Sequence, residues 1–304
     1  MNNCMGKNEK KSALVIINPY AGRMRSRTGV FDIINHLSQN EYDITVHATT
    51  KKDDAIDFVA SLDREYSVVL CCGGDGTLNE VITGMMAHEK RFPIAYIPTG
   101  TANDLAASLG LPRNIIKATS IAIDGTPCDH DIGQFNGTSY FSYIASFGAF
   151  TKVSYATNQQ AKNAVGYLAY LLEGIKNINE IKPHSVSIKS SEFEYDGEIL
   201  FGGVMNTLQA GGVLKMNRKD VDFSDGKFEV LIVKMPKSMT ELSEILRDLA
   251  KGKYDQSGIS LTHTEHIVFE SEEPLSWTLD GEFGGNHKRV EIKNLHRAVK
   301  IMRP

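Results

Sequence analysis

Residues 67–80 place the strongest constraint on the fold, because they predict a strand, a tight glycine turn and a helix in direct succession. Residues 68–72 form a continuous apolar run of strand length, typical of a strand buried on both faces. Three glycines then surround Asp75 in G-G-D-G, and apolar residues resume at helical spacing from Leu78. Glycine lets backbone N–H groups approach a ligand closely, and a helix N-terminus adds partial positive charge. The turn therefore suits phosphate.

Asp75 needs a separate explanation, because a carboxylate in an anion-binding turn should repel phosphate. A Mg²⁺ ion between the carboxylate and the phosphate reverses that repulsion. The alternative is a glycine turn in which Asp75 only caps the following helix. Partners elsewhere in the chain are needed to choose between the two.

Two further strands of the N-terminal half end in similar turns. The apolar run at 13–18 leads into a turn with Gly22 and Arg23, and the strand at 94–97 leads into a turn at 99–104 with hydroxyl, amide and carboxyl side chains. Helical patterns at 30–37 and 56–60 and a strand at 44–47 complete an alternation typical of a parallel sheet covered on both faces. Ligands bind such sheets beyond the carboxyl ends of the strands. Three polar turns on one rim favour a binding site over helix capping alone.

The pattern changes near Asp124, where strand-like segments follow at 131–135, 139–144, 185–188, 199–205, 228–233 and 267–269. Turns are predicted at four pairs with glycine in second place, which begin at Asn136, Asp196, Asp225 and Asp280. Helical patterns occur at 165–178 and 239–251, and 298–302 predicts a strand that returns to the edge of one domain. We expect a three-layer α/β domain at 1–128, completed by 296–304, and an antiparallel β-sandwich-like domain at 129–295.

Charge and cysteine content exclude several classes of protein. A formal net charge of -4 argues against a general nucleic-acid binder. The four cysteines show no C-x-x-C spacing, and Cys71 and Cys72 lie in a predicted buried strand, which indicates reduced packing residues of a cytoplasmic protein. Residues 1–12 lack the apolar region of a secretory signal, and no run reaches the length of a membrane span.

Three motifs together resemble the diacylglycerol kinase catalytic domain, particularly that of soluble bacterial diacylglycerol and related lipid kinases. They are N-P-x-x-G at 18–22, G-G-D-G-T-L-N-E at 73–80 and G-T-A-N-D at 100–104. G-G-D-G alone also occurs in NAD kinases and phosphofructokinases. The resemblance implies that the nucleotide contacts Asn18, Pro19, Tyr20, Ala21, Gly22, Thr49, Gly74, Asp75, Gly76, Thr77, Leu78, Asn79, Glu80 and Thr101. Asp53 stands where relatives often carry glycine, which puts the shape of the loop after Thr49 in question.

By composition alone, the motif L-D-G-E at 279–282 predicts no more than the turn of a β-hairpin. The resemblance implies that Asp280 is the general base, which accepts the hydroxyl proton while positioning and charge neutralisation supply most of the catalysis.

The resemblance also implies magnesium ligands. Asp75, Asp104 and Asp131 would form an acidic network, although Asp131 is equally well explained as an acid at the start of a strand. A structural Mg²⁺ site would use the carboxylate of Asp225 and the carbonyls of Asp222 and Lys227. Ser224 stands where many relatives have a second acid, and one charge fewer lowers the affinity for a hard cation.

The resemblance thus implies an ATP- and Mg²⁺-dependent lipid kinase that converts diacylglycerol to phosphatidic acid. Its first domain, 1–128 completed by 296–304, would be the nucleotide-binding domain, and 129–295 would hold the lipid substrate. The alternatives are a kinase of the NAD kinase type and a nucleotide- or lipid-binding regulator without activity. We expect a cytoplasmic protein, peripheral on the inner membrane face, without a transmembrane segment or a nucleic-acid partner, and a homodimer is left open. The predicted helix at 165–178 is part of the core, a cover between the domains or an entry for lipid tails. Separately, Arg23, Arg25 and Arg27 form a local basic cluster.

Overall fold

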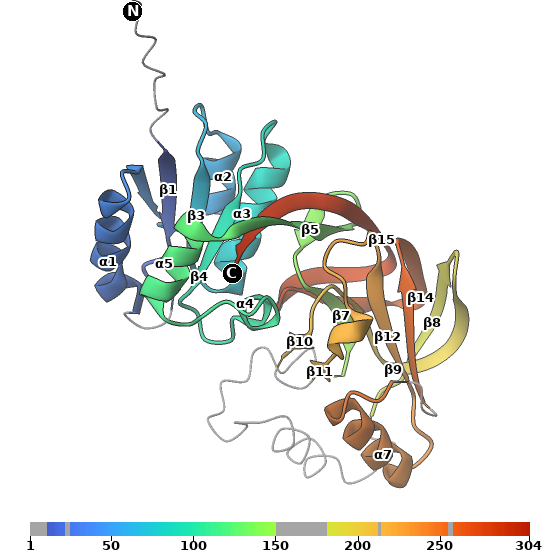
Figure 1. Cartoon of the computed structure of the whole chain (residues 1–304). Coiled ribbons are helices and arrows are strands. Elements are labelled where there is room, and N and C mark those ends of the chain that lie inside the picture. Colours follow the sequence, from blue (N-terminus) through green and yellow to red (C-terminus); the bar gives the residue numbers. More distant parts are fainter. Residues whose placement is uncertain (1–10, 22–24, 150–180, 212–213, 255–257) are drawn as a thin grey trace, which may run out of the picture. The chain divides into compact units, whose positions relative to one another are not determined.

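The structure is a computed structural model of the 304-residue chain, and it describes residues 11–21, 25–149, 181–211, 214–254 and 258–304. The chain divides into two compact units (Figure 1). Unit 1 comprises Met1–Ala106, Gly110–Cys128 and Val299–Pro304, and unit 2 comprises Ala107–Leu109 and Asp129–Ala298. The predicted helix at 165–178 lies outside the described residues, as do Gly22 and Arg23, and the side chains of Arg25 and Arg27 are likewise not described.

Unit 1 contains a parallel sheet, as the alternating pattern predicts. Its strands lie in the order β2 (Asp43–Ala48), β1 (Ser12–Ile17), β3 (Val68–Gly73), β4 (Ile94–Pro98) and the end of β15 (Glu282–Arg303). Every residue of β3 is buried, which is what its continuous apolar run requires. The expected C-terminal return strand is present, because Ile301 of β15 pairs with Ile94 of β4.

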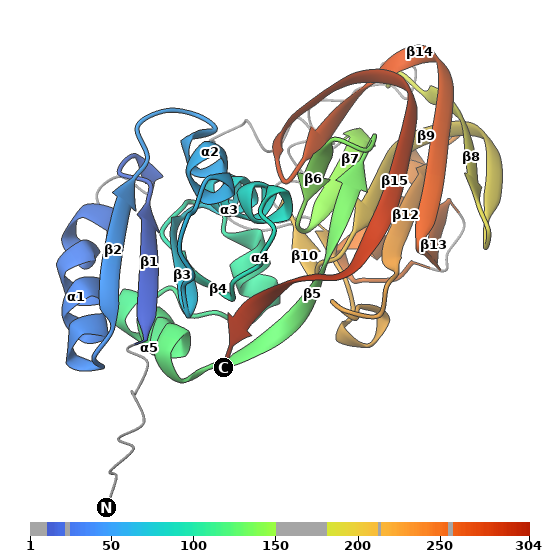
Figure 2. The ribbon, with the colours of Figure 1, turned by 90° about the horizontal axis from the view of Figure 1, so that it is seen from above.

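Helices cover both faces of this sheet and make three layers. Figure 2 shows α1 (Arg25–Gln39) and α5 (Ile115–Asp124) on one face, and α2 (Asp54–Ala60) and α3 (Asp75–Ala87) on the other. Ile33 and Leu37 of α1 and Ala118 and Ala122 of α5 share one apolar core with β1, β3 and β4. Burial of this stripe against the sheet is the main source of stability for such short helices.

Unit 2 is an antiparallel β domain. Its strands are most of β5 (Thr126–Phe135), β6 (Ser139–Phe141), β7 (Ile144–Gly148), β8 (His184–Ser190), β9 (Glu194–Met205), β10 (Gln209–Ala210), β11 (Leu214–Lys215), β12 (Phe228–Lys234), β13 (Ile259–Thr264), β14 (His266–Leu279) and the first part of β15. The sheet order is β13-β12-β9-β7-β14-β15, and β8 pairs with both β9 and β14. The described residues also include a 3-10 helix at Arg218–Asp220, the helix α7 (Met239–Ala250) and, after β4, the helix α4 (Asp104–Ser108).

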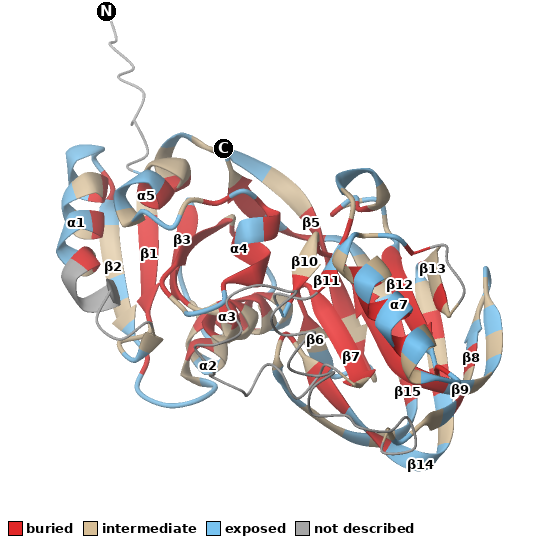
Figure 3. Ribbon diagram, turned by 90° about the horizontal axis from the view of Figure 1, so that it is seen from below, coloured by how far each residue is buried: buried red, intermediate tan, exposed pale blue. Residues whose placement is uncertain are grey.

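The core of unit 2 gathers around Trp277, which is fully buried. The Trp277 ring centroid lies 4.6 Å from that of Phe147 and 5.2 Å from that of Phe269, in tilted and edge-on arrangements that aromatic rings favour. Figure 3 shows how the buried residues concentrate on β7 and β12 in this unit and on β1 and β3 in unit 1.

Three local predictions were wrong. Asp196 and Gly197 lie inside β9, where they pair with Ser187 and Val186, because the connection from β8 to β9 is already closed by the hydrogen bond from Ser190 N to the carbonyl of Phe193 (2.8 Å). The helix after the G-G-D-G turn begins at Asp75 instead of Leu78, because Gly74 is its N-cap. The strand expected at 139–144 is two strands, β6 and β7, since the N–H groups between them donate to a side chain and not to a neighbouring strand.

Candidate active site

The turns after β3 and β4 pack directly against each other in unit 1. The N–H groups of Thr99 and Gly100 both donate to the carbonyl of Gly73, over 2.8 and 3.2 Å. A Cβ atom on Gly100 would lie 2.5 Å from the Cα of Gly74. Such an approach of two backbones is open only to glycine, so these glycines shape the rim.

Asp75 ties the same two turns together through its carboxylate. Its Oδ2 accepts a hydrogen bond from the N–H of Asp104 (3.1 Å), and the hydroxyl of Tyr96 lies 3.3 Å from its Oδ1. The Tyr96 hydroxyl also lies 3.1 Å from Oδ1 of Asn103, whose φ is +54°. Asp75 therefore does more than cap its own helix, because it also holds the turn after β4. It lies on one rim with Asp104, as the sequence predicts.

Asn18 joins the turn after β1 to the start of α3. Its Nδ2 donates to the hydroxyl of Thr77 (2.9 Å), and its Oδ1 accepts from the N–H of Tyr20 (2.9 Å). The Tyr20 side chain is 78% exposed, and Pro19 and Ala21 complete the described part of the turn. The described parts of the three turns thus lie at the carboxyl ends of the strands, where ligands bind such sheets.

The loop after β2 is held by Glu80, which the resemblance counts among the nucleotide contacts. Both Glu80 carboxylate oxygens accept backbone N–H groups at the start of α2, from Asp53 (3.1 Å) and Ala55 (3.3 Å). Partial burial raises the pKa of Glu80, and these N–H donors lower it. Asp53 adopts φ +64°, the left-handed region that favours glycine. Thr49 is buried beside this loop and donates to the carbonyl of Ile17.

The other predicted nucleotide contacts have different surroundings. Gly76, Thr77, Leu78 and Asn79 lie in the first turns of α3, and Leu78 is fully buried in the core. Thr101 is exposed in the turn after β4. Close to it, the buried hydroxyl of Thr99 has no hydrogen-bond partner among the described residues. A polar ligand at this rim would satisfy that hydroxyl.

Asp280 stands in the β14–β15 hairpin turn of unit 2, with φ +49°. Its Oδ2 accepts from the N–H and the hydroxyl of Ser142, over 2.6 and 2.8 Å. Its Oδ1 accepts from the N–H groups of Tyr143 and Ile144, both over 3.0 Å. Three consecutive N–H groups that converge on an anion favour the ionised carboxylate.

Asp131 is fully buried in unit 2 and its carboxylate is already engaged there. It accepts from the N–H groups of Arg297 (2.6 Å) and Gly226 (2.7 Å) and from the side chain of Asn294 (3.3 Å). Burial raises the pKa of Asp131, and these hydrogen bonds lower it. The contacts give Asp131 a structural task, which is to fasten the turn at Gly226 to β15.

The turn that contains Asp222 and Asp225 is shaped by its own carboxylates. Asp222 accepts from the N–H of Ser224 (3.0 Å) and Asp225 from that of Lys227 (2.9 Å). Among the described residues, no group of three or more His, Cys, Asp or Glu side chains could hold a metal ion. A site made from one carboxylate and backbone carbonyls is still compatible with this turn, because all its donors are oxygens, which Mg²⁺ prefers. Asp75 and Asp104 likewise offer two carboxylates, which suffice for an ion that keeps waters and binds phosphate.

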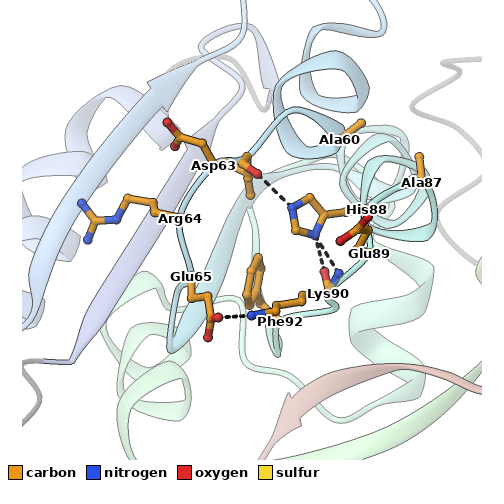
Figure 4. A pocket seen from close by; sticks show the side chains of 10 residues that line it. Ala60, Asp63, Arg64, Glu65, Ala87, His88, Glu89, Lys90 and Phe92 are labelled. Carbon is orange, nitrogen blue, oxygen red and sulfur yellow. Dashed lines mark hydrogen bonds and ion pairs between the residues drawn. The ribbon is translucent and has the colours of Figure 1, made fainter.

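A hollow of about 430 Å³ lies away from these residues, at the end of the unit 1 sheet where β3 begins and α3 ends (Figure 4). His88 bridges the carbonyls of Leu62 and Lys90 there, and Lys90 pairs with Glu65. None of the predicted site residues lines it. Since ligands bind parallel sheets at the opposite end, we assign the hollow no part in the chemistry.

Sequence reasoning missed three residues that organise these sites. Tyr96 sits in an apolar strand, where only its hydroxyl signals a polar contact. Ser142 carries no local signal at all, because its partner Asp280 is 138 residues away. His130 is fully buried, and its Nε2 donates to the carbonyl of Ser142 over 3.1 Å.

Comparisons with known proteins find a matching family model and relatives that span nearly the full chain. Residues 12–135 match the family model described as the diacylglycerol kinase catalytic domain. The chain is 33% identical to a diacylglycerol kinase of Bacillus subtilis (strain 168), over 97% of each chain, and 30% identical to one of Staphylococcus carnosus (strain TM300), over 97% of this chain and 96% of the relative.

The fold is also that of solved structures. One described as a diacylglycerol kinase from Bacillus anthracis (strain Sterne) has a TM-score of 0.75 and 22% identity over 97% of each chain. No helix in the described ranges is both long and apolar enough to cross a membrane. With a relative 33% identical over nearly the full length of both chains, this chain belongs to the diacylglycerol kinase catalytic-domain family and is a kinase.

Proposed function

We propose that this lipid kinase transfers the γ-phosphate of ATP to diacylglycerol and so makes phosphatidic acid, a step of phospholipid biosynthesis. The observation that carries the proposal is the junction at Asp75, where two glycine turns and a helix N-terminus meet. Beside it lies the hydroxyl of Thr99, which has no hydrogen-bond partner within the described part of the chain. Backbone N–H groups and a helix N-terminus suit a triphosphate. We choose diacylglycerol as the acceptor because the relatives are named diacylglycerol kinase.

We assign nucleotide binding to residues 1–128 with 296–304, through residues 18–22, 49, 74–80 and 101, and lipid binding to 129–295. Asp75 and Asp104 would hold Mg²⁺, in part through water, and the ion would neutralise charge on the phosphates. Asp225, with the carbonyls of Asp222 and Lys227, would hold a structural Mg²⁺. For Asp131 we propose support of that turn, because its carboxylate accepts from Gly226 N.

Asp280 is our candidate for the general base. In the transfer, the acceptor oxygen bonds to the γ-phosphorus, the bond from that phosphorus to the bridging oxygen breaks, and ADP leaves with the electron pair. Asp280 takes the proton that the acceptor hydroxyl loses. Because the acceptor resides in a bilayer, we also infer that the protein works as a peripheral protein on the cytoplasmic membrane face.

The test is an assay of the purified protein with labelled ATP, Mg²⁺ and a panel of lipids in mixed micelles, with NAD as a water-soluble acceptor. We expect label in the organic extract, most strongly with diacylglycerol. Label in an aqueous nucleotide would indicate an NAD kinase, and no label would indicate a binding protein.

Two variants test the assigned roles. Asp75→Asn and Asp280→Asn each keep a side chain of nearly the same shape, so we expect a normal circular dichroism spectrum and a loss of turnover of about 10²-fold or more. Near-normal turnover of Asp280→Asn would remove Asp280 from the role of base.

A further inference from the structure

We propose that the hydroxyl of Ser142 relays the acceptor's proton to Asp280, which makes Ser142 a second catalytic residue of the phosphoryl transfer. The proposal rests on the proposed function, in which Asp280 is the general base. It concerns the route of the proton, and it follows from the donors that surround the Asp280 carboxylate.

The Asp280 carboxylate has its acceptor positions filled. An ionised carboxyl group offers about four lone-pair sites. Four donors occupy them at hydrogen-bond distance: the N–H groups of Ser142, Tyr143 and Ile144, and the Ser142 hydroxyl. An acceptor hydroxyl that approaches the resting carboxylate therefore meets no vacant site among those oxygens.

Three of the four donors cannot give way. They are main-chain N–H groups of the link between β6 and β7 and of Ile144, the first residue of β7, and this segment is held from two sides. The His130 ring donates from Nε2 to the carbonyl of Ser142 (3.1 Å), and Asp280 N donates to the carbonyl of Ile144 (2.8 Å). Moving an N–H group away would leave it buried without a partner, which is unfavourable.

The Ser142 hydroxyl differs from the other three donors because it can also accept a hydrogen bond. An acceptor hydroxyl can donate to Ser142 Oγ while Ser142 Oγ–H still donates to Asp280 Oδ2, 2.8 Å away. Ser142 and Asp280 are 1% and 4% exposed, so bulk water does not compete for the proton.

The acceptor's O–H proton moves to Ser142 Oγ while the hydrogen of Ser142 moves to Asp280 Oδ2. The freed electron pair of the acceptor oxygen forms the bond to the γ-phosphorus of the nucleoside triphosphate, and the nucleoside diphosphate leaves with the electrons of the broken P–O bond. Ser142 ends as a hydroxyl again, and Asp280 ends protonated.

A direct route makes the opposite prediction for one variant. If the acceptor hydroxyl displaced the Ser142 hydroxyl and bonded to Asp280 itself, Ser142→Ala would leave a site on Oδ2 open, and turnover would stay the same or rise. If Ser142 relays the proton, the same variant loses turnover while lipid binding is retained.

The experiment measures kcat and the KM for diacylglycerol in mixed micelles for Ser142→Ala. We expect kcat to fall by about 10²-fold and KM to change less than about twofold, because a relay acts on the chemical step. The matched control is Ser146→Ala, which removes a buried hydroxyl bonded to Thr278 Oγ1 (3.0 Å) in the same pair of strands without touching Asp280. A kcat of Ser142→Ala equal to that of Ser146→Ala would overturn the relay.

A second pair of variants covers a failure of Ser142→Ala to fold. Ser142→Thr and Ser142→Val add almost the same volume, but only the first keeps a hydroxyl. If Ser142 relays the proton, Ser142→Thr keeps turnover and Ser142→Val loses it. Equal turnover in the two variants would refute the relay. Asp280→Asn separates the two proposals. If Asp280→Asn is active, the assigned base is wrong, and if it is inactive while Ser142→Val is active, the relay alone is wrong.

Discussion

Gly100 lies so close to Gly74 that a Cβ atom on Gly100 would stand 2.5 Å from the Cα of Gly74. Gly100 follows β4 and Gly74 is the N-cap of α3, so this contact sets the spacing between two of the proposed nucleotide-binding turns. It leads to the first of three predictions.

We expect Gly100→Ala to lower both stability and nucleotide affinity. The added methyl group also meets Oδ1 of Asn103 at 2.7 Å, so the turns must move apart. Overpacking of this kind lowers the free energy of unfolding by about 1–3 kcal/mol. Urea denaturation measures the stability, and equilibrium dialysis with ATP measures the affinity. Wild-type values in both would show that the close contact has no consequence.

The second prediction concerns the anion site that holds Asp280. Asp280→Ala leaves the N–H groups of Ser142, Tyr143 and Ile144 without their acceptor, and we expect a loss of about 3 kcal/mol or more in the free energy of unfolding. Asp280→Asn keeps one acceptor oxygen and should lose less. Chemical denaturation of both variants makes the comparison, and equal losses would mean that the carboxylate oxygens do not organise the link between β6 and β7.

The third prediction is a pH dependence that originates at Glu229 on β12. Its side chain is buried, and its Oε2 has no hydrogen-bond partner among the described residues. Burial raises the pKa of Glu229 from 4.5 to about 9, and Asp225, Asp222 and Asp220 add to the rise. Between these two values the folded protein keeps the proton and the unfolded chain releases it. Stability should therefore fall as pH rises through this window, by up to about 1.4 kcal/mol per pH unit.

Glu229→Gln removes the titrating group. We expect this variant to be more stable than the wild type at pH 8, with a difference that shrinks as pH falls towards 4.5, below which the folded and the unfolded chain both hold the proton. Thermal unfolding in buffer with a chelator measures the effect without a contribution from bound cations, and the exposed Glu273→Gln serves as the control. A parallel pH dependence in wild type and Glu229→Gln would contradict the assignment.

The pattern of residues along the chain was enough to predict the elements that carry the proposed site. The apolar run of β3 is buried throughout, and Asp75 and Asp104 lie on the same rim, because parallel strands bring their carboxyl ends to one edge. Asp53, where the sequence departs from the glycine of many relatives, has a φ of +64°, a region that glycine enters without steric cost and that Asp occasionally adopts.

Other features were decided by the tertiary structure alone. Asp131 appeared as a strand-start acid or a member of a magnesium network, and the fold uses it to hold Gly226 and Arg297. The apolar pattern around Glu229 gave no sign that its carboxyl group would be buried, with Oε2 lacking a hydrogen-bond partner among the residues that the structure describes. The Asp196–Gly197 pair resembled a turn and became part of β9.

The physical reason is the range of the interactions. Hydrophobic periodicity and turn chemistry act over a few residues, so a single sequence displays them directly. The contact between Ser142 and Asp280 spans 138 residues, and it exists only because β7 and β14 pair and bring a strand end to a hairpin turn. Local residues therefore determined which acids and glycines could serve the proposed chemistry, and strand pairing determined which donors surround each of them.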